Sequence, residues 1–135
     1  MVGFNILKDI SDRPSRLVAT ASATFVAGDL VELTAGSVNW AKVTSSSDHF
    51  TRKAIVHSGG TSVTSVLVQE LYGNELVVAE SANNGAAAHN GDRMAFTDEN
   101  TVNNSASDVT GQAVGFVQTG FVGAAADKRI VGYVL

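Results

Sequence analysis

FVAGDLVELTAGSVNWAKV, residues 25–43, is the stretch that decides the fold class of this chain. Residues 30–33 and 38–43 are two segments rich in β-branched and apolar residues, and Ala35-Gly36 separates them. Strands favour such residues, and a glycine lets a tight hairpin loop adopt a positive φ. The stretch therefore predicts two antiparallel strands joined by a short turn.

The same pattern extends along most of the chain and predicts an all-β fold, either a sandwich or a small barrel. Gly73-Asn74 separates the next pair of predicted strands. Regular alternation fails at Val66-Leu67-Val68, so that strand is expected to be buried on both faces or to contain a bulge. The predicted strands are 16–21, 29–34, 37–43, 52–57, 63–71, 75–79, 93–96, 113–118 and 129–134.

Helical signals are weak. Residues 82–89 begin with Asn83-Asn84-Gly85 and are predicted to form a long loop with a single turn. Residues 100–108 are small and polar and are predicted to form an exposed loop. Gly-Asp followed by a strand occurs at Gly28-Asp29 and again at Gly91-Asp92, a turn-and-strand device that is common in β proteins.

Residues 1–15 differ in composition from residues 16–135, and we expect an N-terminal arm followed by one β domain. Pro14 closes the arm and biases Arg13 toward an extended conformation. Two interpretations stay open. The segment is a first edge strand or a frayed terminus, or it is a segment that folds on a partner.

The composition excludes several classes of protein. The chain has 135 residues, the size of one domain, with 16% charged residues and a net charge of −4. Coating a nucleic acid needs a concentrated cationic face, so no nucleic-acid partner is expected. There is no cysteine, and no apolar run is long enough to cross a membrane. The first residues lack the features of a secretion signal, so export is not expected.

The candidate chemical groups form no familiar motif. His49, His57 and His89 lack the spacing of metal ligands, and no Gly-x-Ser-x-Gly elbow accompanies them. The acidic run at 98–100 lacks the ligand spacing of a calcium loop. We therefore predict no catalytic residue, no metal site and no cofactor.

The chain resembles the decoration or cement proteins that stabilise the heads of tailed phages, of the lambda head decoration type. The resemblance rests on a short arm followed by a β domain rich in Ser, Thr, Ala, Val and Gly, with FVAGDLVELTAGSVNWAKV (25–43) and GQAVGFVQTGFV (111–122). It implies a β-tulip or related small barrel and a homotrimer. The trimer would be made in the host cytoplasm, would bind the outer surface of the capsid and would bridge subunits of the major capsid protein. The family has no catalytic residues to transfer.

On this interpretation, apolar arm residues add a strand to an exposed edge of the capsid sheet. The residues expected to bind the capsid are Phe4, Ile6, Leu7, Arg13 and Arg16. The aromatic residues expected at the trimer interface are Trp40, Phe116 and Phe121.

Two other classes of function stay open. A carbohydrate- or receptor-binding β module, such as a fibre tip, would use Trp40 and exposed Asn, Ser and Thr side chains. A small hydrolase would need Asp48, His49 or His57 to converge in one cleft.

Overall fold

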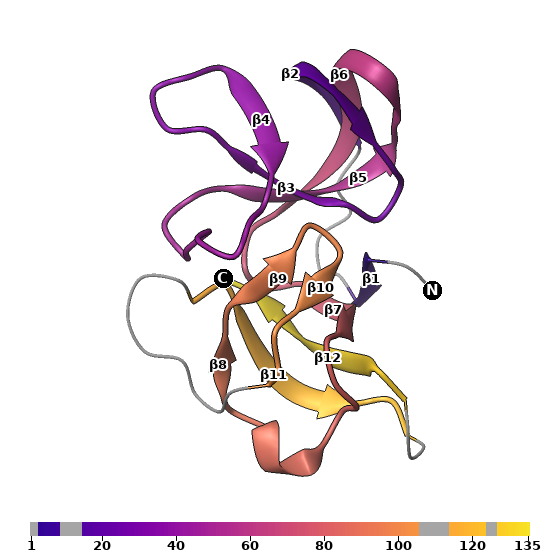
Figure 1. Cartoon of the computed structure of the whole chain (residues 1–135), viewed down its shortest axis with the longest axis vertical. Helices are drawn as coiled ribbons and strands as arrows, with labels where there is room; N and C mark the ends of the chain where they lie inside the picture. Colours follow the sequence, from indigo (N-terminus) through magenta and orange to yellow (C-terminus); the bar gives the residue numbers. More distant parts are fainter. Residues whose placement is uncertain (1–2, 9–14, 106–113, 124–126) are drawn as a thin grey trace.

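The computed structural model describes residues 3–8, 15–105, 114–123 and 127–135 (Figure 1). The chain is all-β and contains a small closed barrel, as its sequence predicts. In chain order the elements are β1 (Phe4–Lys8), β2 (Arg16–Phe25), β3 (Leu30–Leu33), β4 (Asn39–Lys42), β5 (Lys53–Ser58), β6 (Gly60–Leu71), β7 (Leu76–Ser81), the 3-10 helix η1 (Ala87–His89), β8 (Arg93–Met94), β9 (Phe96–Asp98), β10 (Thr101–Val102), β11 (Phe116–Phe121) and β12 (Arg129–Val134).

The barrel forms the upper lobe in Figure 1 and contains the strands in the order β2-β4-β3-β5-β6. It closes where β2 runs parallel to β4, with Thr20 opposite Trp40. Successive side chains of a strand point to opposite faces, so Val66 and Val68 of β6 both point into the barrel. The buried interior consists of Val18, Phe25, Val31, Trp40, Ala54, Val56, Val66 and Val68.

The lower lobe is a second sheet, in the order β8-β11-β12-β7-β10-β9, with β1 paired to β7. Its core contains Phe4, Phe96 and Phe116. Leu30 and Ile55 of the barrel belong to the same core, because they point outward from the barrel wall onto the second sheet. The two lobes are therefore packed on a shared apolar layer.

The chain crosses between the lobes twice. β1 is antiparallel to β7, with Phe4 opposite Ala79, and β2 is antiparallel to β6, with Arg16 opposite Val68. The chain thus runs up from the second sheet into the barrel between β1 and β2, and it returns between β6 and β7. Gly73-Asn74 lies in this return crossing, so it does not form a hairpin between paired strands.

A buried carboxylate fixes the return crossing. Glu75 is 1% exposed, and its carboxylate accepts hydrogen bonds from the backbone N–H groups of Tyr72, Gly73 and Asn74 at 3.0–3.2 Å. Gly73 has a φ of +89°, which suits a residue without a Cβ. Backbone donors that a turn leaves unpaired are satisfied in this way by a side chain from the same turn.

The predicted hairpin at Ala35-Gly36 is confirmed, since β3 and β4 are antiparallel and Gly36 has a φ of +72°. The bulge that the sequence predicted as one possibility within strand 63–71, at Val66-Leu67-Val68, lies instead on the neighbouring strand β5. Val56 lies opposite Val68 and Ser58 opposite Leu67, so His57 is the extra residue.

The two Gly-Asp segments form the same turn. Gly28 and Gly91 have φ values of +94° and +88°. The backbone N–H of Asp29 donates to the carbonyl three residues earlier at 3.0 Å, and that of Asp92 does the same. The repeated Gly-Asp sequence therefore forms the same local turn twice, once just before β3 and once just before β8.

The predicted loop at 82–89 contains the single turn η1, as expected. The prediction of a wholly exposed loop at 100–108 is wrong for its described part. Thr101 and Val102 form β10, and both Val102 and Asn104 are buried. Among the described residues, no helix is long and apolar enough to span a membrane.

Residues 4–8, which the sequence analysis assigned to an arm, form β1 and belong to the second sheet. Of the two interpretations left open, the structure favours a first edge strand for this part of the segment. The backbone N–H of Phe4 also donates to the carbonyl of Gly28 at 2.9 Å, which ties β1 to the barrel.

Candidate functional site

The residues predicted to bind a capsid divide between the core and the surface. Phe4 is fully buried, and its ring packs edge-on against Phe96 and Phe116. Ile6 is partly buried against the same core, Leu7 lies in β1, and Arg13 lies outside the described residues. The prediction that Phe4 offers its side chain to a partner is corrected, because the chain's own core encloses the ring.

Two of the three aromatic residues predicted at a trimer interface are also core residues. Trp40 is 4% exposed inside the barrel, and Phe116 is fully buried in the second sheet. Neither ring is accessible to a second copy, so both assignments are corrected. Phe121, at the end of β11, is 37% exposed and stays available for contact.

The burial of Trp40 also bears on the glycan-binding alternative. A sugar needs an accessible aromatic face to stack on, and the barrel interior encloses this one. Trp40 is thus unavailable for the role that this alternative gave it.

The histidines do not converge. His49 and His57 line separate hollows, and His89 contacts Asp92 at 3.2 Å beside η1. The hydrolase alternative required Asp48, His49 or His57 to converge in one cleft. Asp48 and His49 are neighbours in one loop, where the Asp48 carboxylate accepts the N–H of Phe50, and His57 lines a separate hollow. No group of three His, Cys, Asp or Glu side chains within the described ranges is placed to hold a metal ion.

Exposed apolar side chains gather around the loop between β4 and β5. Val38 and Phe50 line a hollow of about 490 Å³, and Phe50 and Tyr72 line a second one of about 220 Å³. Arg52 lines both hollows. We call the surface formed by Val38, Phe50, Arg52 and Tyr72 the Phe50 face.

Hydrogen bonds hold the loop that carries Phe50. The carboxylate of Glu32 on β3 accepts from the hydroxyls of Ser47 and Thr51, both at 2.8 Å. The carboxylate of Asp48 accepts from the backbone N–H of Phe50 at 2.9 Å. The backbone under Phe50 is therefore fixed before any partner arrives, which reduces the ordering cost of binding.

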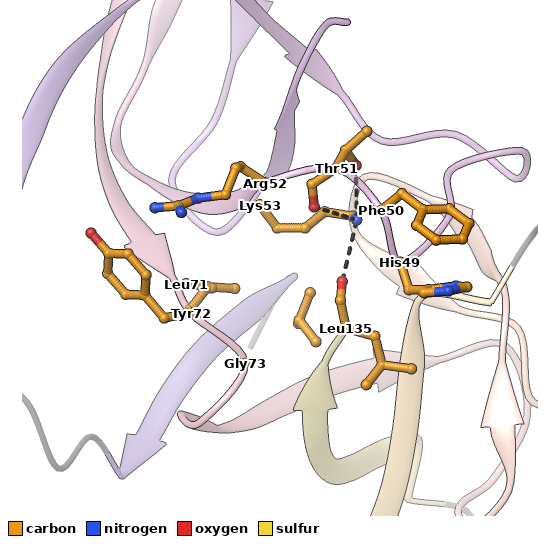
Figure 2. A pocket seen from close by; sticks show the side chains of 10 residues that line it. His49, Phe50, Thr51, Arg52, Lys53, Leu71, Tyr72, Gly73 and Leu135 are labelled. Carbon is orange, nitrogen blue, oxygen red and sulfur yellow. Dashed lines mark hydrogen bonds between the residues drawn. The ribbon is translucent and has the colours of Figure 1, made fainter.

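Lys53 secures the same loop from below (Figure 2). It is 2% exposed, and its ammonium donates to the carbonyl of Asp48, to the hydroxyl of Thr51 at 3.0 Å and to the carbonyl of Leu135 at 3.3 Å. Burial lowers the pKa of Lys53, while the charges of Glu32 and Asp48 act to raise it. Because Leu135 follows β12, this ammonium links the loop to the second sheet.

A charged cluster borders the Phe50 face. The guanidinium of Arg16 lies 2.6 Å from one carboxylate oxygen of Glu70, and that of Arg52 lies 3.7 Å from the other. The Tyr72 hydroxyl donates to Glu70 at 3.1 Å, and the Arg52 guanidinium lies 4.7 Å from the centre of the Tyr72 ring. The hydrogen bond from Arg16 is the main cause that lowers the pKa of Glu70. Arg16, predicted to bind a capsid, thus lies at this cluster.

None of the site residues predicted from the sequence lies in the Phe50 face. Phe50 is a lone aromatic residue inside the polar stretch 44–51, and that isolation is the signal that marks it. Val38 belongs to the predicted strand 37–43, but it lies in the hairpin turn just before β4 begins at Asn39. Comparison of the chain with protein-family models, with curated proteins and with solved structures found no match.

Proposed function

We propose that this chain is a non-enzymatic structural protein of a virus particle, a homotrimeric decoration protein on the outside of a tailed-phage head. On this proposal it binds the major capsid protein, bridges neighbouring subunits and stabilises the shell. The sequence resemblance described above motivates the assignment to this class.

The observation that carries the proposal is the Phe50 face. An enzyme needs convergent polar groups, whereas a protein that works by assembly needs an apolar surface presented on a fixed frame. Phe50 presents an apolar side chain of this kind. Its loop is fixed because the Thr51 hydroxyl donates to Glu32 and accepts from Lys53. The chain's low charge supports the same conclusion, because few charged groups lose water when the domain packs against other subunits.

Burial of Phe4 changes how the capsid would be recognised. In the present structure β1 is already paired with β7. We therefore assign the bridging contact to side chains on the surface of the domain. Arg13, which lies outside the described residues, keeps the capsid-binding role that the sequence predicts.

The proposal is tested by adding the purified protein to phage heads that lack it. We expect saturable binding, measured by co-sedimentation, and release of the packaged DNA at a higher temperature than from bare heads. Heads that bind no protein, or that release DNA at an unchanged temperature after binding it, would contradict the proposed role.

A further inference from the structure

The Phe50 face is a large exposed apolar patch. Val38 is 79% exposed, Phe50 77% and Tyr72 51%. With about 150–250 Å² for each aromatic side chain, the three together expose roughly 400 Å², within the range of the largest patches on monomers. A stable interface buries about 800 Å² on each partner, so this patch supplies about half of one side.

The shape of the face suits insertion of a side chain. Phe50 lines both hollows. In Figure 2 its ring extends away from Arg52 and Tyr72. Leu71 and Leu135 contribute apolar side chains to the smaller hollow, and Thr51 and Lys53 contribute polar ones. One surface therefore carries both a projecting ring and a recess that is partly apolar.

The charges of the face are self-complementary. Among the described residues Arg16 and Arg52 share one carboxylate, that of Glu70, which leaves one positive charge in excess in this cluster on a chain whose net charge is −4. Asp48 lies two residues before Phe50. Among the described residues, its carboxylate accepts a hydrogen bond from the backbone N–H of Phe50. An approaching copy would bring this carboxylate together with its Phe50 ring.

We propose that the Phe50 face is the contact between copies of this chain, with Phe50 of one copy seated in the hollow of its neighbour and Asp48 near the neighbour's Arg52. This inference rests on the proposed function, since it assigns the contact of the proposed trimer. The Phe50 face takes the place of Trp40 and Phe116 as the predicted trimer interface, because the chain's own core encloses those two rings.

The test is sedimentation equilibrium of the full chain and two variants. Phe50→Ser is expected to weaken association by roughly 30-fold or more, the effect of losing a central apolar anchor. Arg52→Glu is expected to weaken it too, because it places like charges opposite each other. The matched control is Leu17→Ser, which removes a 68% exposed apolar side chain from β2 and is expected to leave association unchanged.

The outcomes separate this inference from the proposed function. A dimer that Phe50→Ser dissociates supports the inference and contradicts the trimer. A trimer that Phe50→Ser leaves intact overturns the inference and leaves the proposed function standing. If Phe50→Ser abolishes binding to phage heads but not self-association, the face contacts the shell and the inference is overturned. A monomer at all concentrations overturns it as well. Circular dichroism of each variant establishes that it is folded.

Discussion

The ring of Phe4 packs edge-on against the ring of Phe96, with centroids 5.8 Å apart and planes at 76°. This contact joins the first strand of the chain to β9 in the core of the second sheet. Edge-to-face packing of buried rings contributes beyond the burial of their area. The N-terminal strand is therefore part of the folded domain in this structure.

Phe4→Ala is expected to lower the free energy of unfolding by about 3–5 kcal/mol, because it leaves a cavity among buried rings. Urea denaturation measures the change. Leu17→Ala, on the exposed side of β2, is the control and is expected to cost no more than about 0.5 kcal/mol. A loss below about 1 kcal/mol for Phe4→Ala would show that β1 is not held in the core.

Gly3 and Gly36 form a matched pair for a second prediction. Their φ values are +75° and +72°, so alanine meets similar backbone strain at both. A Cβ at Gly3 would lie 2.3 Å from the carbonyl oxygen of Gly28, whereas at Gly36 it would meet nothing within 4 Å. Gly36→Ala is expected to cost about 1–2 kcal/mol, and Gly3→Ala distinctly more.

Thermal unfolding of both glycine variants against the parent chain makes the comparison. Equal losses would mean that Gly3 and Gly28 do not approach each other closely in solution.

Local sequence patterns predicted most of the strands but not their partners, and they missed β10, which lies in the stretch predicted to be an exposed loop. The alternation of Leu30 to Leu33 and the turn at Gly36 are local signals, and the hairpin that they predict is present. The pairing of β1 with β7 joins distant residues, such as Phe4 with Ala79, and no local pattern encodes it. Composition set residues 1–15 apart as an arm, but it did not show that Phe4 packs in the core of the second sheet.

The site was harder to predict for a related physical reason. An aromatic residue on a strand, such as Trp40, is either a core or an interface residue, and the strand pattern does not distinguish a barrel interior from an outer surface. Phe50 lies in a polar loop, where no periodic pattern assigns it a face. The hydrogen bonds of its loop, such as those that the Thr51 hydroxyl donates to Glu32 and accepts from Lys53, explain why it is held at the surface.

The lowered pKa of Lys53 predicts a specific pH dependence. As pH rises, Lys53 loses its ammonium proton at a lower pH in the folded chain than in the unfolded chain, where the lysine titrates near 10.5. The unfolded state then binds more protons, so the stability of the parent chain relative to Lys53→Met should rise through this window and level off above it. Urea denaturation between pH 7 and about pH 11 measures this difference. A flat or falling difference would contradict the burial of the ammonium.

Asp29 predicts the opposite trend at acidic pH. Burial raises its pKa, although the N–H of Val26 and the charge of Lys42 oppose the shift. The folded chain therefore keeps this proton to a higher pH than the unfolded chain, and the stability that protonation confers is lost as pH rises from 3.8 through the raised pKa.

Asp29→Asn is expected to remove that dependence while keeping an acceptor for the Val26 N–H. The stability of the parent chain relative to this variant should decrease between about pH 4 and pH 7. Chemical denaturation across that range tests it, and a difference that increases with pH would contradict the buried environment of Asp29.

The most direct test of the central claim is an electron cryo-microscopy reconstruction of the source particle, made with and without this protein. The account predicts difference density on the outer surface of the head, with three barrels meeting at each three-fold or quasi-three-fold position and Phe50 at their mutual contact. Difference density confined to the tail or to the inside of the shell, or no density on the particle, would contradict it.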